Sequence, residues 1–245
     1  MGSRKWWGLV ASVVLVSASD GAMTAKTENN KGFAYYNGQG VPKNYQKAVY
    51  WWRTAAAQGY ALAEFNMGNA YYFGQGVPMN YQRAVYWYRK AARQRDSIAE
   101  FDMGNAYGLG QGVPKNYQKA VYWWRTAAAQ GYALAEVNMG NAYHFGQGVP
   151  KNYQKAVYWF RKAATQGYAL AEVRMGFAYG LGQGVPKDFV QAYKWFALAK
   201  SVAKPGGRTY SAASTEIRQV SLSMSPSQIA QAQALAYAWA KAHEK

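Results

Sequence analysis

A five-residue segment, Gly-Gln-Gly-Val-Pro, recurs along this chain at a fixed interval of 36 residues. Its five copies begin at Gly38, Gly74, Gly110, Gly146 and Gly182. A constant period in this range is typical of repeat proteins, in which each unit buries its apolar face against its neighbours. The spacing therefore predicts five repeats, at 25–60, 61–96, 97–132, 133–168 and 169–204.

The first half of each repeat predicts an α-helix, which in the second copy covers about 61–73. Its apolar residues fall on one helical face, namely Ala63, Met67, Ala70 and Tyr71. Gly74 can adopt a positive φ and end this helix, and Pro78 prevents the helix from continuing. A glutamate in the first turn, where a negative charge suits the helix dipole, recurs as Glu64, Glu100, Glu136 and Glu172.

The second half predicts another helix, from about Tyr81 to Gln94 in the second copy. Asn80 stands at the N-cap position, and its counterparts are Asn44, Asn116, Asn152 and Asp188. The apolar stripe of this helix consists of Ala84, Trp87, Tyr88, Ala91 and Ala92. Gly68 on the first helix lets the two helices approach, and we expect Trp87 to fill the space opposite. The aromatic content of 17% is then explained by the core.

Both ends of the array depart from the repeat pattern. In the first copy Asn29 and Lys31 replace Phe65 and Met67 of the second, as the polar outer face of a terminal repeat requires. At the other end, residues 205–245 predict two capping helices, from about Thr209 to Leu222 and from Pro226 to about His243. Ser225 through Gln228 forms a capping box with proline at the first helical position.

These segments resemble the Sel-1-like repeat family, a relative of the tetratricopeptide arrays. The resemblance covers 25–204 and is carried by three motifs of the second copy: Met67-Gly68-Asn69-Ala70-Tyr71, Gly74-Gln75-Gly76-Val77-Pro78 and Arg83-Ala84-Val85-Tyr86-Trp87-Tyr88-Arg89-Lys90-Ala91-Ala92. It implies an all-α fold, an α/α superhelical solenoid of five 36-residue two-helix repeats with a C-terminal helical cap. It also implies a protein-interaction or adaptor role, often at the bacterial envelope.

The N-terminal residues are expected to be a signal peptide, at 1–22. Arg4 and Lys5 precede an apolar run from Trp6 to Ala18, which is too short to span a bilayer comfortably. Cleavage is expected after Ala18 or Ala22. The mature protein would then be periplasmic or secreted, with no transmembrane span. An uncleaved anchor or a poorly ordered start is the alternative interpretation.

In such solenoids the first helices line a concave groove, which is expected to bind a protein or peptide. Candidate groove residues lie away from the apolar stripe of the first helices: Asn66, Asn69, Tyr72, Asp102, Asn105, Asn138, Asn141, His144 and Arg174. The ladder of Asn69, Asn105 and Asn141 is suited to hydrogen bonding with an extended peptide backbone. The alternative interpretation is that these are solvated residues copied by duplication.

Basic residues on the second helices suggest a second kind of surface. The chain holds 28 basic and 11 acidic residues, a net charge of +17. Stacked repeats would align Lys47, Arg83, Lys119 and Lys155. These cations are suited to an anionic envelope polymer, a lipid headgroup or an acidic protein, although a solvated basic face is the simpler interpretation. Nucleic acid is not expected as a partner.

The sequence offers little for catalysis. It has no cysteine and two histidines, and no cluster of metal ligands, paired carboxylates or phosphate loop stands out, so no cofactor, metal or catalytic residue is expected. Ser201-Val202-Ala203-Lys204 matches the Ser-x-x-Lys motif of β-lactam enzymes but lacks its companion segments. The absence of cysteine also argues against the branch of the family linked to β-lactam chemistry. We therefore predict a binding protein that is not an enzyme.

Overall fold

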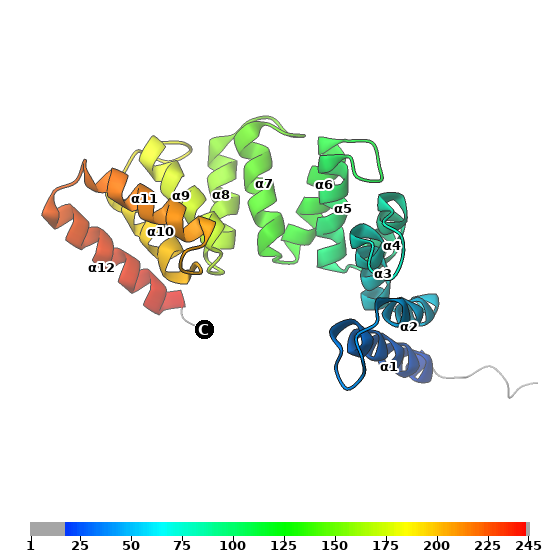
Figure 1. Ribbon diagram of the computed structural model, residues 1–245. Coiled ribbons are helices and arrows are strands. Elements are labelled where there is room, and N and C mark those ends of the chain that lie inside the picture. Colours follow the sequence, from blue (N-terminus) through cyan, green and yellow to red (C-terminus); the bar gives the residue numbers. More distant parts are fainter. Residues whose placement is uncertain (1–17, 244–245) are drawn as a thin grey trace, which may run out of the picture. The chain divides into compact units, whose positions relative to one another are not determined.

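The computed structural model describes residues 18–243, and its regular structure within that range is α-helical (Figure 1). The helices are α1 Ala18–Asn37, α2 Tyr45–Ala57, α3 Ala61–Phe73, α4 Tyr81–Arg93, α5 Ser97–Leu109, α6 Tyr117–Ala129, α7 Ala133–Phe145, α8 Tyr153–Ala164, α9 Ala169–Leu181, α10 Phe189–Val202, α11 Arg208–Ser221 and α12 Pro226–His243. Within these residues, no helix combines the length and the apolar composition that crossing a membrane requires. The predicted all-α fold of two-helix repeats is confirmed.

The chain forms two compact units. Within the described residues, the first comprises residues 18–99 and 111–113, and the second comprises residues 100–110 and 114–243. In the first unit, α1 packs on α2, α2 on α3 and α3 on α4. In the second unit each helix from α6 to α10 packs on the next, and α11 and α12 both pack on α10. In the second unit the buried apolar residues of neighbouring helices form three successive clusters.

Local signals in the sequence determine the helix ends as predicted. In each repeat the Asx side chain before the second helix accepts a hydrogen bond from the backbone N–H three residues later, for example Lys119 N to Asn116 Oδ1 at 2.9 Å. Gly74, Gly146 and Gly182 end the first helices in the left-handed conformation. Such side-chain caps satisfy backbone groups that have no partner inside the helix.

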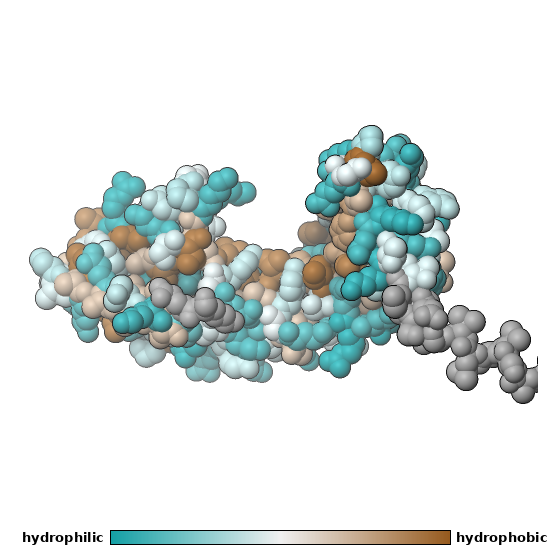
Figure 2. Space-filling view, turned by 90° about the horizontal axis from the view of Figure 1, so that it is seen from below, coloured by the Kyte–Doolittle hydropathy of each residue, from teal (hydrophilic) through white to brown (hydrophobic). Residues whose placement is uncertain are grey.

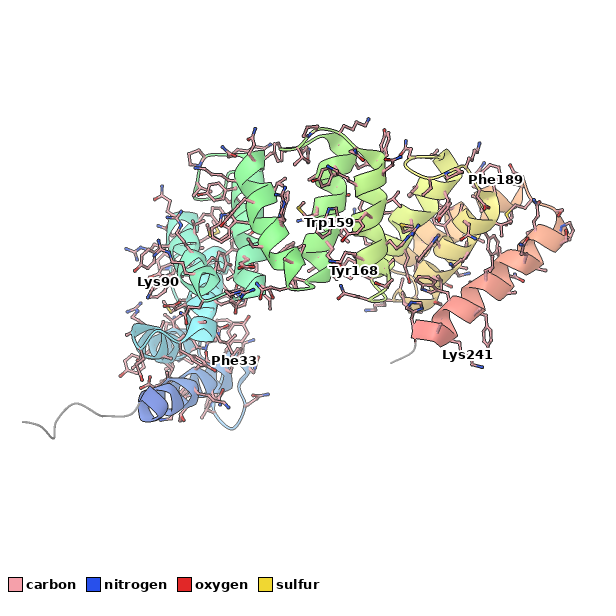
Figure 3. The ribbon with its side chains drawn as sticks, turned by 180° about the vertical axis from the view of Figure 1, so that it is seen from behind. Phe33, Lys90, Trp159, Tyr168, Phe189 and Lys241 are labelled. Carbon is pink, nitrogen blue, oxygen red and sulfur yellow. The ribbon has the colours of Figure 1, made fainter. Side chains whose placement is uncertain are left out.

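The two helices of a hairpin approach closely at a glycine, but its partner differs from the predicted one. A Cβ on Gly68 would overlap the ring of Tyr88, and a Cβ on Gly140 would overlap the ring of Phe160. The prediction that Trp87 fills this space is therefore wrong. In both repeats the ring that faces the glycine belongs to the residue that follows the tryptophan: Tyr88 follows Trp87, and Phe160 follows Trp159. Trp159, labelled in Figure 3, instead packs from the side against the core of the third and fourth repeats.

Neighbouring repeats are joined tightly at the loops. In the second unit, a Cβ on Gly148 would overlap the backbone carbonyl of Tyr117, which begins the second helix of the preceding repeat. Gly148 also has a φ of +73°. The second glycine of every loop after the first is therefore required for close packing as well as for the turn, whereas Gly40 in the first loop has no neighbour within 4 Å of where its Cβ would stand.

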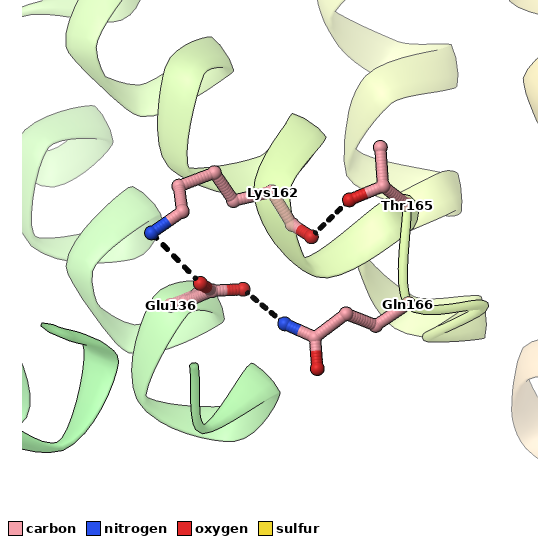
Figure 4. A network of polar contacts seen from close by, with 4 residues as sticks. All are labelled: Glu136, Lys162, Thr165 and Gln166. Atoms are coloured by element: carbon pink, nitrogen blue, oxygen red, sulfur yellow. Dashed lines mark hydrogen bonds and ion pairs between the residues drawn. The ribbon is translucent and has the colours of Figure 1, made fainter. Parts of the chain in front are cut away.

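The recurring glutamates are buried, and in the second, third and fourth repeats they form a polar connection inside the hairpin. Glu136 is fully buried, and its Oε2 accepts a hydrogen bond of 2.8 Å from Gln166 (Figure 4). Its Oε1 lies 3.1 Å from the Nζ of Lys162. The predicted place in the first helical turn is confirmed, and the carboxylate additionally connects the two helices of the repeat.

The exposed aromatic residues correct the expectation that these rings belong to the core. One tyrosine in each of the first four second helices is more than half exposed: Tyr50, Tyr86, Tyr122 and Tyr158. Each forms an edge-to-face pair with the tryptophan that follows it, with ring centroids 5.2 Å apart. The outer face of the second helices is therefore partly aromatic.

The C-terminal cap agrees with its prediction, while the N-terminal one agrees only in part. The backbone N–H of Ser225 donates to Gln228 Oε1 at 2.8 Å, and Gln228 N donates to Ser225 Oγ at 3.3 Å, which is the capping box. Lys31 is exposed as expected, but Asn29 is only 1% exposed because it accepts a hydrogen bond from Asn66. The signal-peptide prediction falls mostly on residues 1–17, outside the described residues; Ala18 and Ala22 lie at the start of α1.

Candidate functional site

Two cavities lie on the first helices of the second unit, one repeat apart. The first has a volume of about 420 Å³ and lies between the third and fourth repeats. Its lining consists of Asn105, Gly108, Leu109, Tyr117, Trp124, Asn138, Asn141, Phe145 and Gln147. Apolar residues, brown in Figure 2, reach the surface among hydrophilic ones over these repeats. The cavity thus combines four side-chain amides with apolar walls.

The first cavity is open because a glycine replaces a tyrosine. In the first unit, Tyr72 stands at the position equivalent to Gly108, and its hydroxyl donates to Gln111 Oε1 at 3.1 Å. Gln147 is the counterpart of Gln111 and lines the first cavity, where Gly108 offers no side chain to reach it. The space that a tyrosine occupies in the second repeat is therefore available to a ligand in the third.

The amides of Asn105 and Asn141 occupy equivalent positions but have different surroundings. Asn105 Oδ1 accepts hydrogen bonds from Trp124 Nε1 at 3.1 Å and from Asn138 Nδ2 at 3.2 Å. The residue opposite Asn141 is Phe160, which has no donor. Asn141 Oδ1 is accordingly buried without a hydrogen bond from residues 18–243. A buried carbonyl without a partner is costly, so a ligand N–H would satisfy this atom if it displaced the side chains that close it from solvent.

The second cavity, of about 310 Å³, repeats the first between the fourth and fifth repeats. It is more apolar, since Phe177 occupies the position of Asn141. Its lining includes Tyr153, Phe160, Leu181 and Gln183, with Phe145 as a wall shared by both cavities. Its basic side chains are His144 and Arg174. The two cavities therefore form one continuous surface across three repeats.

The two basic side chains of the second cavity affect each other. Burial lowers the pKa of the Arg174 guanidinium, and its Nε lacks a hydrogen-bond partner within residues 18–243. Burial also lowers the pKa of His144, and the positive charges of Arg174 and Lys151 lower it further. The ring of His144 lies edge-to-face on Tyr153, with centroids 5.1 Å apart. His144 is therefore neutral at neutral pH, which leaves Arg174 as the charged group of this cavity.

Of the nine residues predicted for the groove, five line the cavities: Asn105, Asn138, Asn141, His144 and Arg174. The three in the first unit have internal partners. Asn66 is 5% exposed and donates to Asn29, so its proposed place in an open groove is wrong. Asn69 accepts from Tyr88 at 2.7 Å, and Tyr72 donates to Gln111. Asp102 accepts a hydrogen bond of 3.4 Å from Asn105.

The large apolar residues at the ends of the first helices were not predicted as site residues. Leu109, Phe145 and Leu181 are 65%, 56% and 62% exposed, and each lines a cavity. A signal was present, because every repeat after the first has a large apolar residue immediately before the loop glycine, off the apolar stripe of the helix.

The four cations predicted for a basic surface are exposed, two in each unit, and each lies over an aromatic ring. Lys47, Arg83, Lys119 and Lys155 are exposed. They lie 5.3 to 5.4 Å from the ring centroids of tyrosines on the first helix of the same repeat. Cation–π contacts of this kind stabilise a hairpin modestly. The repetition of these cations therefore has a structural explanation.

Within residues 18–243, no group of three or more His, Cys, Asp or Glu side chains is placed to hold a metal ion. The hydroxyl of Ser201, from the Ser-x-x-Lys segment, donates to the carbonyl of Leu198 at 2.8 Å. It is thus engaged with its own helix.

The fold is that of an α-helical repeat protein, and two cavities lie on its first helices. The Sel1 repeat model matches the chain at 29–60, 61–96, 97–132, 133–168 and 169–201. The chain belongs to the Sel1 repeat family, whose fold is in general a protein-interaction scaffold.

Several solved structures are similar to this chain. A Sel1 repeat protein from Oxalobacter formigenes is 35% identical, with a TM-score of 0.72 and 78% of each chain covered. A protective antigen present in uropathogenic Escherichia coli strains is 27% identical, with a TM-score of 0.49, and the match covers 89% of this chain and 61% of the antigen. A Sel1 repeat protein from Klebsiella pneumoniae is 18% identical, with a TM-score of 0.51 and coverage of 83% and 97%. Comparison with curated proteins gave no match.

Proposed function

We propose that this chain is a non-catalytic adaptor that binds an extended peptide segment of a partner protein across the two cavities. The observation that carries this proposal is the unpartnered Oδ1 of Asn141, which is buried at the wall of the first cavity. A peptide N–H that reached this atom would supply the hydrogen bond that Phe160 cannot. The protein-interaction role of the family supports the same function.

The spacing of the amides suits an extended backbone. Asn105, Asn138 and Asn141 come from two successive first helices and line one cavity. Backbone N–H and C=O groups of an extended peptide are obligatory hydrogen-bonding groups, and amide side chains offer both a donor and an acceptor to them. Side chains of the same peptide would be received by the apolar walls at Leu109 and Phe145.

The experiment uses short random peptides displayed on phage, selected on the full chain and then measured by calorimetry. The test variant is Gly108→Tyr, which places in the first cavity the side chain that the second repeat has at Tyr72. The first repeat shows that a tyrosine fits beside a tryptophan here, since the rings of Tyr36 and Trp52 lie 5.4 Å apart. We expect peptide affinity to fall by about tenfold or more, which corresponds to about 1.4 kcal/mol.

The fold should withstand this change, because replacing a glycine inside a helix removes an entropic cost of roughly 0.5–1 kcal/mol. Far-UV circular dichroism and the melting temperature of Gly108→Tyr provide that control. If the selected peptides bind Gly108→Tyr as tightly as the parent chain, they do not use the first cavity and the proposal is wrong. Failure to select any peptide would count against it as well.

We also propose that the protein is exported, because residues 1–22 have the charge and apolar pattern of a signal peptide. Expression of the full chain in a bacterial host, followed by cell fractionation and N-terminal mass spectrometry, tests this. The expected result is a periplasmic or secreted protein that begins at Ser19 or Met23. A cytoplasmic product that retains Arg4 and Lys5 would contradict it.

A further inference from the structure

We infer that the second cavity makes this surface selective for acidic segments, in which an aspartate or glutamate side chain pairs with Arg174 and a neighbouring large apolar side chain enters the cavity. This inference rests on the proposed function, since it names the chemistry of the peptide bound there. It goes further in assigning the two cavities different tasks. The first cavity binds the peptide backbone, and the second cavity binds one acidic side chain and one apolar side chain.

The position of Arg174 is exceptional within the array. The equivalent residues in the preceding three repeats are Asn66, Asp102 and Asn138, so a cation stands here only in the fifth repeat. No acidic side chain within residues 18–243 pairs with this guanidinium; the ion pairs there join Lys90 to Glu64 and Lys162 to Glu136. Its Nε is buried and lacks a hydrogen-bond partner in the same residues. Arg174 is therefore a cation without a paired anion among the described residues.

The surroundings of Arg174 strengthen its attraction for a carboxylate. Phe145, Phe160 and Phe177 line the same cavity, together with Leu181. Charged groups interact more strongly where apolar side chains exclude water. A guanidinium presents a planar set of N–H donors that matches the two oxygens of a carboxylate. The neighbouring His144 is uncharged at neutral pH, so it does not compete for the anion.

The size of the cavity limits what can enter it. A volume of about 310 Å³ is at the lower end of the range for ligand pockets. It accommodates one or two side chains and excludes a folded element. Because Phe145 is also a wall of the first cavity, a chain that leaves the amides of the first cavity passes directly to Arg174. The acidic residue and the apolar residue are therefore expected to be adjacent in the peptide.

The charge of the whole chain favours the same kind of partner. With 28 basic and 11 acidic residues, the net charge is +17, which attracts acidic partners without specifying where they bind. A test of Arg174 must therefore separate a specific ion pair from this general attraction. Arg125 provides the matched control, because it is an exposed arginine of the same unit that does not line either cavity.

The probes are fluorescent peptides with an acetylated N-terminus and an amidated C-terminus. They carry Phe-Asp or Asp-Phe in a glycine-serine background, and their matched partners carry Phe-Asn or Asn-Phe. Anisotropy is measured with the full chain and with Arg174→Gln and Arg125→Gln, at about 0.15 M salt, where exposed charges are largely screened. A further probe ends in phenylalanine with a free carboxylate and contains no aspartate.

We expect at least one aspartate peptide to bind about tenfold more tightly than its asparagine partner, as a charge-assisted pair implies. Arg174→Gln should remove this preference, and Arg125→Gln should retain it. Equal binding of the aspartate and asparagine peptides, or equal losses in the two variants, would overturn the inference while the proposed function stands. Preference for the free carboxylate over the internal aspartate would overturn it too. The comparison between peptides needs only the parent chain, so it does not depend on whether a variant folds.

Discussion

The Nζ of Lys162 lies 3.1 Å from the Oε1 of Glu136, and this ion pair has no counterpart in the fifth repeat. There, Leu198 stands where Lys162 does, and Val202 stands where Gln166 does. Glu172, the equivalent of Glu136, is 2% exposed and its Oε2 has no hydrogen bond from the residues described. Burial raises the pKa of Glu172 from 4.5 to about 7.

Glu172→Gln should therefore stabilise the protein in neutral and alkaline solution. Because the folded-state pKa lies above the unfolded value, the folded state retains a proton between pH 4.5 and about 7, and stability falls as the pH rises through this interval. The neutral amide removes that loss, so we expect a gain of up to about 3 kcal/mol near pH 8 and a small effect near pH 5. Melting temperatures of both chains across this range provide the measurement.

Glu136→Gln is the matched control and should behave in the opposite way. It removes a carboxylate that is paired with Lys162 and hydrogen-bonded by Gln166. We expect a loss of roughly 1–2 kcal/mol near pH 8. If the two glutamine variants shifted stability equally and in the same direction, the difference between the two carboxylates would not be the cause.

Asn141→Leu and Asn105→Leu should separate stability from binding. Asn141 lacks a partner for its buried Oδ1, so its replacement by an apolar residue is expected to leave stability unchanged or raise it by up to about 1 kcal/mol. Asn105 accepts from Trp124, and losing that bond should cost about 1–3 kcal/mol. Both variants should weaken peptide binding. Urea unfolding with calorimetric titration checks this, and a clear destabilisation by Asn141→Leu would contradict the assignment.

Arg95→Gly should stabilise the second repeat. Arg95 has a φ of +64°, and glycine stands at the equivalent positions Gly59, Gly131 and Gly167. A left-handed conformation costs roughly 1–2 kcal/mol for residues with a Cβ, so the glycine variant should gain about 1 kcal/mol. Gly131→Ala is the reverse control and should lose a similar amount. The midpoint of urea unfolding, at constant slope, reports both changes.

The pKa of His144 should rise when an acidic peptide binds. In the chain without a bound peptide, burial and the charges of Arg174 and Lys151 lower this pKa below its usual value of 6.5. A carboxylate on Arg174 offsets part of that charge, and a protonated His144 then becomes more favourable. The ring-proton signals of His144 can be followed by NMR across a pH titration, with His243 on α12 as an internal reference. An unchanged titration of His144 on saturation would place the carboxylate away from Arg174.

Much of the fold could be predicted because its determinants are local. The N-cap at Asn116 and the capping box at Ser225 depend on residues only three positions apart, and the loop glycines act at their own positions. The choice between Trp87 and Tyr88 as the partner of Gly68 was wrong because the two are adjacent. Either ring can face the first helix until the crossing of the helices determines which one does.

The site was harder to predict because its features depend on whether a residue far away in the sequence supplies a hydrogen-bond partner. Asn141 is unpartnered because residue 160 is phenylalanine, whereas residue 124, which serves Asn105, is tryptophan. Asn66 is buried, and its hydrogen-bond partner is Asn29 of another helix. Such pairs are separated by a whole helix and a loop. They become visible only when the three-dimensional contact is known or the copies are compared position by position.

The contact between Gly148 and the carbonyl of Tyr117 also limits how an array of this kind changes in length. An added or deleted residue in the loop would bring a side chain against that carbonyl, so small changes in length are incompatible with stacking. Whole repeats can be gained without such a conflict. The segments 43–62 and 115–134, two repeats apart, are identical, as the copying of a two-repeat block would leave them. Such an array therefore changes in evolution by whole repeats, and each added repeat extends the proposed peptide-binding surface by one first helix.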